Sequence, residues 1–311
     1  MQWSDRIGRR LKTRDLHVFL AVAERGNMAK AADQLAISRP VVSKTIADLE
    51  HTLGVRLLDR TPQGVEPTIY GKALLKRSLS VFDELRQSVK EIEFLADPGT
   101  GELRVGFGEV TAAGLVPMAI DRLTRRFPRM AVQTEQGAIG TVLDFLRSRR
   151  CEVAVGRQSP DAPDLAFEPI HYEQLHVVVG AASKWARARR VKLADLVDEP
   201  WVQAPVEVES GSPTLQAFHE AGLSAPNVVV MSASLNLRYG LLESGRFVTM
   251  IPDSALHYGS KRAAIKVLPV RLPKWHVPTC AVTLKDRTLS PIARLFIDCL
   301  HEMAKPLAKR V

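Results

Sequence analysis

The stretch from Ala29 to Glu50, AKAADQLAISRPVVSKTIADLE, constrains this chain more than any other. It predicts two short helices joined by a tight turn, because small and branched apolar residues recur at helical spacing on each side of Ile37. Ser38 is placed to cap the second helix with its hydroxyl. Pro40 falls in that helix's first turn, where its missing N–H is no loss. Ahead of this pair, a helix beginning near Asp15 is predicted to anchor the small core with Phe19.

The second helix is predicted to have a buried side and an exposed side. Val42, Ile46 and Leu49 repeat at three- and four-residue spacing and should face inward. The outer face keeps Arg39, Ser43, Lys44 and Asp48. An exposed helix whose N-terminal end carries Arg, Ser and Lys is typical of a recognition helix in the DNA major groove. Arg39 is the side chain predicted to pair with a guanine.

The segments LEHTLGVRLLDR (49–60) and TPQGVEPTIYG (61–71) complete a resemblance. With the helix-turn-helix, they resemble the winged DNA-binding domain of LysR-type transcriptional regulators over about the first 95 residues. The family commonly has Ser-Gln-Pro where this chain has Ser38-Arg39-Pro40, a departure that bears on the base read there. Pattern and resemblance together give these expected contacts to double-stranded DNA: Ser38, Arg39, Pro40, Ser43, Lys44, Arg60, Thr61 and Gln63.

Composition agrees with a nucleic-acid partner. The 311 residues suffice for two or three domains, and the net charge is +9 with a pI of about 9.6. Residues 1–77 hold 14 Lys and Arg against 8 Asp and Glu, so the excess is concentrated beside the motif. A generic basic surface is the alternative reading of this charge.

Residues 70–96 lack proline and contain a continuous apolar pattern, formed by Leu74, Leu75, Leu79, Phe82, Leu85, Val89, Ile92 and Leu95. A helix of about 25 residues would span roughly 37 Å and could bury such a seam against a second copy. Packing against its own domain is the alternative. The resemblance adds a tetramer formed through C-terminal domains. Asp97-Pro98-Gly99-Thr100-Gly101 is predicted to be the hinge that follows.

Beyond the hinge, strand-like and helix-like segments alternate, which indicates an α/β fold with parallel sheets covered on both faces. The resemblance implies an effector domain of two lobes, similar to periplasmic solute-binding proteins. The expected domains are a winged helix-turn-helix at 1–70, a dimerisation helix at 71–97 and the effector domain at 98–311. Lobe one would comprise 98–165 and 270–311, and lobe two 166–269.

Hydroxyl-bearing and glycine-rich segments follow several predicted strands, where helix N-termini offer backbone N–H groups to a ligand. The expected effector contacts are Val110, Thr111, Gly137, Ala138, Thr141, Ser210, Ser212 and Ser232. Taken singly, these Ser and Thr residues are more simply helix caps. A carboxylate or sugar acid would suit such a site. If Glu109, Glu207 and Glu209 also line it, they would favour a hydroxylated or cationic ligand instead.

Other function classes find little support. There is no G-x-S-x-G, no phosphate-binding loop and no HExxH, so no catalytic residue, metal or cofactor is predicted. His171 and His176 are expected on the surface, and Cys151 and Cys280 as buried structural thiols in a reducing cytoplasm. No apolar run approaches the roughly 20 residues of a membrane span. The alternative to an effector-gated regulator, with RNA polymerase as a further partner, is a helix-turn-helix protein whose C-terminal domain is catalytic or architectural.

Overall fold

The computed structural model describes residues 11–62, 64–158, 161–259, 264–273 and 278–308. The chain divides into two compact units, Met1–Val89 and Lys90–Val311, and each is described by itself. Gln63, one of the expected DNA contacts, lies outside the described residues. No described helix combines the length and apolar character needed to cross a membrane.

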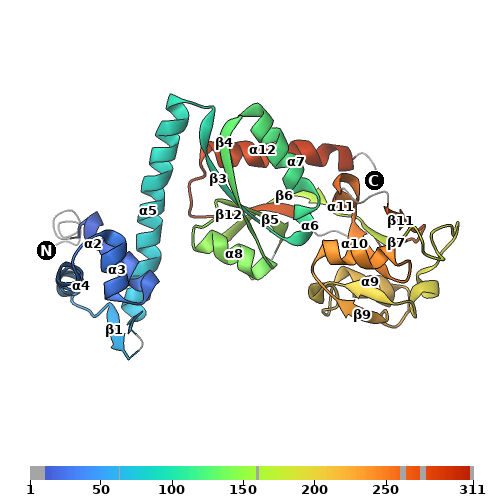
Figure 1. The fold of residues 1–311 in the computed structure, drawn as a ribbon, viewed down its shortest axis with the longest axis horizontal. Helices are drawn as coiled ribbons and strands as arrows, with labels where there is room; N and C mark the ends of the chain where they lie inside the picture. The colour runs from blue at the N-terminus through green and yellow to red at the C-terminus, as the bar shows by residue number, and fades with distance from the viewer. Residues whose placement is uncertain (1–10, 63, 159–160, 260–263, 274–277, 309–311) are drawn as a thin grey trace. The chain divides into compact units, whose positions relative to one another are not determined.

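Helices packed around one small core, with a two-stranded hairpin, form most of the first unit (Figure 1). The elements are α2 (Thr13–Arg25), α3 (Met28–Leu35), α4 (Arg39–Leu53), β1 (Leu58–Thr61) and β2 (Gly64–Pro67). Phe19 is fully buried in this core with Ala31, Val42 and Ile46, which confirms it as the anchor.

The turns of this unit follow from particular residues. Gly26 ends α2 in the left-handed conformation, with φ of 60°. Asn27 then caps α3, because its side-chain oxygen accepts hydrogen bonds from the backbone N–H groups of Ala29 and Lys30. Gly71 allows the next helix to pass close to the hairpin: a Cβ there would lie 2.0 Å from the carbonyl oxygen of Leu57.

Helix α5 (Ile69–Ala96) is the long helix that the apolar pattern predicts, and the boundary between the two units falls within it. Its seam is divided. Leu74 and Leu75 pack against the core of the first unit, and Phe94 packs against a core of the second. The large apolar side chains that remain exposed between these ends are Val81, Leu85, Val89 and Ile92, and Leu95 beyond Phe94 is exposed as well. Packing within the chain's own units therefore uses only part of the seam.

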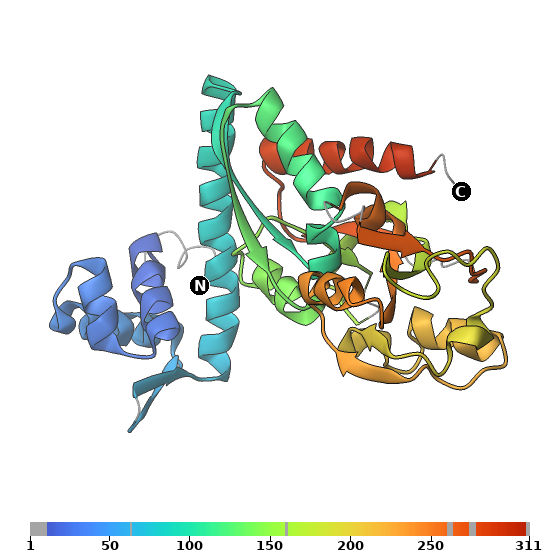
Figure 2. The same cartoon turned by 45° about the vertical axis from the view of Figure 1, so that its right-hand side comes forward.

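In the second unit, the first lobe is a five-stranded sheet in the order β4-β3-β5-β12-β6. Its strands are β3 (Thr100–Phe107), β4 (Arg129–Gln136), β5 (Val153–Arg157), β6 (Leu165–Tyr172) and β12 (Pro278–Leu284). Helices α7 (Leu115–Arg126) and α12 (Pro291–Ala308) cover one face and α8 (Ile139–Arg147) covers the other (Figures 1 and 2). The short helix α6 (Glu109–Ala112) follows β3.

The second lobe is a five-stranded sheet in the order β11-β7-β10-β8-β9. Its strands are β7 (Leu175–Gly180), β8 (Trp201–Gln203), β9 (Val228–Met231), β10 (Val248–Pro252) and β11 (Ile265–Val267). Helix α9 (Pro213–Glu220) packs on the face that carries Trp201, and α10 (Leu235–Glu243) packs on the face that carries Val202. Helix α11 (Asp253–Tyr258) follows β10, and short 3-10 helices η1 (Leu193–Leu196) and η2 (Pro205–Glu207) flank β8.

Two details of the predicted architecture need correction. The sheets are mixed, because β12 runs antiparallel to both β5 and β6, and β7 runs antiparallel to β10 and β11. Strand β6 also belongs to lobe one, so this lobe continues past residue 165 to Tyr172. The segment LAFEPIHY did not indicate a strand because it contains Pro169 and the charged Glu168, which an edge strand such as β6 tolerates.

Candidate DNA-binding and effector sites

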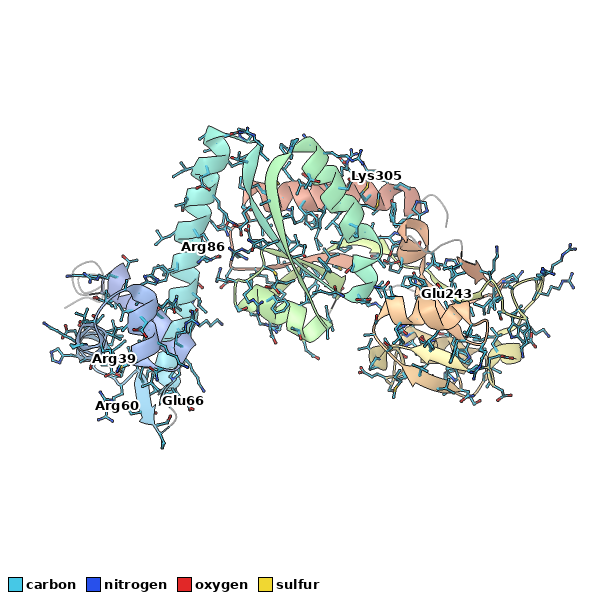
Figure 3. All side chains as sticks on the ribbon, in the orientation of Figure 1. Arg39, Arg60, Glu66, Arg86, Glu243 and Lys305 are labelled. Atoms are coloured by element: carbon cyan, nitrogen blue, oxygen red, sulfur yellow. The ribbon has the colours of Figure 1, made fainter. Side chains whose placement is uncertain are left out.

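Helix α4 presents polar residues outward from its N-terminal half. Val42, Ile46 and Leu49 are buried, as their spacing predicts. Arg39, Pro40 and Lys44 are exposed, and Ser43 is half-buried. Figure 3 shows Arg39 on this helix and Arg60 on the hairpin. The exposed basic groups therefore belong to two elements of one compact unit.

Ser38 departs from the expected capping role. It occupies the N-cap position of α4 with extended backbone angles, but its side chain makes no capping hydrogen bond. Pro40 supplies part of the reason, since a proline in the first turn removes one N–H that a cap would satisfy. The exposed hydroxyl of Ser38 thus lies at the positive end of the helix, where an anion is stabilised.

The hairpin is held to the rest of the unit from both sides. The Glu50 side chain, on α4, accepts hydrogen bonds from the backbone N–H groups of Leu57 at 2.7 Å and Leu58 at 3.2 Å. On the other strand, the N–H of Val65 donates to the carbonyl of Gly26 at 2.9 Å. Arg60 is paired in register with Val65 and is exposed, whereas Thr61 is half-buried. These bonds fix Arg60 relative to the recognition helix.

In the effector domain, the predicted contact residues lie beyond the carboxyl ends of strands β3, β4, β8 and β9, and their environments differ. Thr111 and Ser212 are buried. Gly137, Val110 and Ser232 are half-buried, and Ala138, Thr141 and Ser210 are exposed. Contrary to the expectation from the sequence, the side chain of Thr111 does not cap α6. Its hydroxyl donates to the carbonyls of Gly108 at 3.0 Å and Val155 at 3.3 Å.

Glu109 connects the two lobes. Its carboxylate accepts a hydrogen bond from the backbone N–H of Leu235, at 3.0 Å, in the first turn of α10. It also accepts one from the side-chain amide of Gln136, at the end of β4. Beside it, Val110 packs against the lobe-two core that contains Leu235. A carboxylate of lobe one therefore sits at the positive end of a lobe-two helix, which is the place an anionic ligand would take.

A buried ion pair fixes the loops of lobe two. Arg238, only 2% exposed, lies 2.9 Å from the carboxylate of Glu207 and donates to the carbonyl of Ser232 at 2.9 Å. The Ser212 hydroxyl donates to the carbonyl of Glu207 at 2.7 Å and accepts from Leu215 in the first turn of α9. Ser212 and Ser232, which come from different loops, are thereby positioned by one network. The carboxylate of Glu207 is consequently paired with Arg238 and does not add an unpaired negative charge to a ligand site.

Two polar side chains near these loops are buried and make no hydrogen bond within the described residues: the amide of Gln203, at the end of β8, and the hydroxyl of Thr214, in the first turn of α9. Buried polar groups in proteins are normally hydrogen-bonded, so such groups mark a place that water or another molecule completes. Neither residue is among the expected effector contacts, although Thr214 belongs to one of the hydroxyl-bearing segments that the sequence indicates. The glutamine at a strand's carboxyl end was the available signal.

The three cysteines and His171 are buried in the effector domain. All three cysteines are buried, and burial raises the pKa of Cys151 and of Cys280 to about 11. Their expected structural role agrees with this inert environment. His171, in contrast, was expected on the surface and is only 6% exposed; it lies 3.1 Å from a carboxylate oxygen of Asp253. The prediction failed because Asp253 is far from His171 in sequence.

Comparison with known proteins agrees with this architecture. The model of the bacterial regulatory helix-turn-helix proteins of the lysR family matches residues 13–72, and the model of the LysR substrate binding domain matches residues 96–305. The HTH-type transcriptional regulator TdcA of Escherichia coli (strain K12) is 30% identical over 294 residues, covering 94% of this chain and 93% of TdcA. GbpR of Azospirillum brasilense is 28% identical over 304 residues, covering 97% of this chain and 89% of GbpR.

Solved structures share the fold along nearly the whole chain. Full-length CbnR complexed with its target DNA matches with a TM-score of 0.57 at 24% identity, covering 94% of this chain and 100% of CbnR. A full-length OxyR variant from Pseudomonas aeruginosa matches with a TM-score of 0.68 at 22% identity, covering 95% and 97%.

A winged helix-turn-helix, a long connecting helix and a two-lobed α/β domain together define a DNA-binding transcriptional regulator with an effector-binding domain. The chain belongs to the LysR family.

Proposed function

We propose that α4 and the β1–β2 hairpin divide the work of operator recognition. Arg39, Ser43 and Lys44 face the bases and nearby phosphates in the major groove. Arg60, with Ser38, Pro40, Thr61 and Gln63, fixes the register on the backbone. The observation that carries this division is the exposure of Arg39 and Lys44 on a helix whose other face is buried. The hydrogen bonds of Glu50 support it by holding the hairpin to the same helix.

Binding curves on specific and random duplexes test the division. Arg39→Ala should reduce affinity for the specific duplex by about 5- to 150-fold, the equivalent of about 1–3 kcal/mol, with a smaller loss on random DNA. Arg60→Ala should weaken both equally and reduce the salt dependence by about one ion. Arg25→Ala, an exposed change at the end of α2, is the control. An equal loss on both duplexes for Arg39→Ala would remove this residue from base reading.

We further propose that the protein acts as a homodimer through α5 and as a tetramer through its effector domains, in the cytoplasm and without catalytic activity. The exposed side chains Leu85, Val89 and Ile92 support the dimer, because they recur at four and three residues along one helix face. Replacing Leu85 and Ile92 with Ser should dissociate this interface in sedimentation velocity. Contact with RNA polymerase would follow from binding at a promoter.

For the effector, we propose a neutral, hydroxylated ligand bound between the lobes near Glu109. The contacts would come from Val110, Thr141, Ser210, Ser232 and the loop at Gly137 and Ala138. Thr111 and Ser212 would act by shaping the site, since their hydroxyls are occupied. The carboxylate of Glu109 supports this ligand class, because it neutralises the N-terminus of α10 and offers an acceptor to hydroxyl groups. A carboxylate effector would have to displace it.

A thermal-shift panel of neutral aldoses, benzoate and putrescine tests the ligand class. At least one aldose should stabilise the unmodified protein, whereas benzoate should not. Glu109→Gln should weaken the aldose effect about tenfold in concentration and allow benzoate to stabilise, since the resident charge at α10 is gone. Glu243→Gln, an exposed change at the end of α10 opposite to Leu235, is the matched control. Stabilisation of the unmodified protein by benzoate would overturn this proposal.

A further inference from the structure

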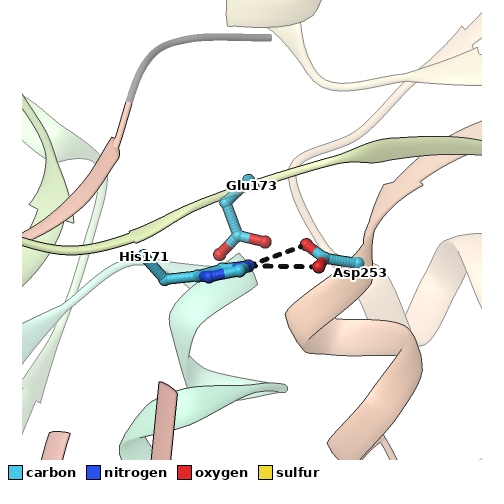
Figure 4. A group of neighbouring side chains, drawn as sticks. All are labelled: His171, Glu173 and Asp253. Carbon is cyan, nitrogen blue, oxygen red and sulfur yellow. Dashed lines mark hydrogen bonds and ion pairs between the residues drawn. The ribbon is translucent and has the colours of Figure 1, made fainter. Parts of the chain in front are cut away.

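A buried polar cluster lies where the chain passes from lobe one to lobe two (Figure 4). His171 is near the end of β6, and Glu173 lies between β6 and β7. Asp253 and Ser254 begin α11, directly after β10 of lobe two. Thr279 lies on β12, which belongs to the sheet of lobe one. Segments from both lobes thus meet at one point.

Hydrogen bonds join these segments in pairs. The Nε2 atom of His171 lies 3.1 and 3.2 Å from the two carboxylate oxygens of Asp253. The backbone N–H of Gln174 donates to the Asp253 carboxylate at 3.0 Å, and the N–H of Asp253 donates to the Gln174 carbonyl at 2.8 Å. Asp253 therefore fixes the segment between β6 and β7 against the start of α11.

Glu173 is the centre of the cluster and is only 2% exposed. One of its carboxylate oxygens accepts hydrogen bonds from the hydroxyl of Ser254 at 2.7 Å and the hydroxyl of Thr279 at 3.0 Å. A single carboxyl group is therefore bonded both to α11 and to the lobe-one strand β12. Any opening of the lobes about this point must break or rearrange those bonds.

The charge state of the cluster is unusual for a buried site. Burial, and then the hydrogen bond and negative charge of Asp253, raise the pKa of Glu173 to about 7. Burial opposes the charged form of His171, but its hydrogen bond to Asp253 and the negative charges of Asp253 and Glu173 together outweigh this and raise the pKa of His171. The hydrogen bonds from His171 and Glu173 likewise outweigh burial for Asp253 and lower its pKa. Below neutral pH, the cluster thus holds a protonated Glu173 beside an ionised Asp253.

The neighbouring elements add few other charges. On β7, His176 interacts with Asp253, and burial lowers the pKa of His176. Strand β12 carries no charged residue, and its Cys280 lies in the separate core with Val142 and Leu146. On α6, Glu109 is directed to the N–H of Leu235. Helix α11 also carries the titratable His257, near its C-terminal end. The three titratable groups that lie within 4.8 Å of one another are Glu173, His171 and Asp253.

We propose that His171, Glu173 and Asp253 form a proton-linked lock. By this we mean a hydrogen-bonded cluster whose protonation state controls how firmly the segments that connect the two lobes, here called the hinge, are held together. With its proton, Glu173 donates to Asp253 while accepting from Ser254 and Thr279, and the crossing segments are held together. Without that proton, two carboxylates adjoin in a buried site and the lock weakens. The proposal concerns the hinge alone and holds whether or not Glu109 selects the effector.

The direction of the pH dependence follows from the pKa shifts. Because the pKa of Glu173 is raised from 4.5 to about 7, its stabilisation is complete below about 4.5 and is lost as the pH rises through about 7. The raised pKa of His171 acts in the same direction, above its ordinary 6.5. The lowered pKa of Asp253 matters only below 3.8 and leaves this range unaffected. The lock should therefore weaken from pH 5.5 to pH 8.

Glu173→Gln tests the proposal in the full-length protein, because a neutral amide can donate to Asp253 and accept from Ser254 at every pH. Hydrogen exchange of residues 172–176 and 253–258 is compared with the unmodified protein at the same pH. From pH 5.5 to pH 8, opening of the unmodified protein should increase about tenfold relative to the variant. The melting temperature of the variant should correspondingly exceed that of the unmodified protein only at the higher pH. Glu243→Gln, exposed at the end of α10, should change neither comparison.

Two outcomes would overturn the lock. One is a difference in exchange between Glu173→Gln and the unmodified protein that does not change with pH. The other concerns the donor set, since one imidazole and two carboxylates within 4.8 Å of one another could hold a cation. If micromolar Zn²⁺ stabilises the unmodified protein but not His171→Ala, and abolishes the pH dependence, the cluster is a metal site and not a proton-linked lock.

Discussion

The charged residues of the candidate sites lie in opposite environments in the two units of this protein. In the first unit, Arg39, Lys44 and Arg60 lie on the surface of a small apolar core. In the second, Arg238 and Glu207 are buried and paired with each other, and Glu173 is buried and accepts hydrogen bonds from the hydroxyl groups of Ser254 and Thr279. Surface charges can bind a polyanion with little effect on folding, whereas buried ones are coupled to stability and to lobe geometry. Substitutions of these surface residues in the first unit should therefore change DNA binding without changing stability. Substitutions of the buried residues in the second unit should change stability and lobe geometry together.

Arg238→Ala should have the largest effect on stability. It leaves the buried carboxylate of Glu207 without its partner, which typically costs about 3–5 kcal/mol. Circular dichroism and calorimetry of the full chain should show a lower melting temperature for the effector domain, with operator binding by the first unit retained at low temperature. Arg246→Ala, an exposed change in the same lobe, is the control. The double change Arg238→Met with Glu207→Leu should recover much of the loss; if it does not, the ion pair is not the cause.

The contrast between the units also explains what could be read from sequence. The helix-turn-helix is built from local signals: Pro40 lies in the first turn of the second helix, and Val42, Ile46 and Leu49 have a helical period. These features were predicted at residue level. The alternation of strands and helices also predicted an α/β fold, and the family resemblance implied its two lobes, although an edge strand with Pro169 was missed.

The buried clusters could not be predicted in this way. His171 and Asp253, or Thr111 and Val155, meet only through strand order and crossovers, and neither pair has a local spacing. The same holds for Glu109 and Leu235, which are 126 residues apart. Side-chain identity gave these residues their chemistry, but only the topology gave them partners.

Thr111→Val should have an intermediate effect that distinguishes shape from ligand contact. The buried hydroxyl donates to two backbone carbonyls, so its loss should cost about 1–2 kcal/mol of effector-domain stability. Urea denaturation monitored by tryptophan fluorescence measures this, and Thr141→Val, which alters an exposed hydroxyl, should cost less than about 0.5 kcal/mol. If Thr111→Val instead leaves stability unchanged and abolishes the aldose response, the hydroxyl contacts ligand and the effector site includes it directly.

Ser38→Ala should have the smallest effect on stability and provides the sharpest comparison within the first unit. Asn27 and Ser38 occupy equivalent N-cap positions of successive helices, but only Asn27 makes capping hydrogen bonds. Asn27→Ala should therefore cost about 1 kcal/mol, whereas Ser38→Ala should cost less than about 0.5 kcal/mol. Because the Ser38 hydroxyl is exposed at the positive end of the recognition helix, its loss should still reduce operator affinity several-fold. Thermal melts and operator titrations of the two variants side by side measure both quantities. Equal destabilisation by the two changes would show that Ser38 caps α4 in solution, and unchanged operator affinity would remove its hydroxyl from the DNA interface.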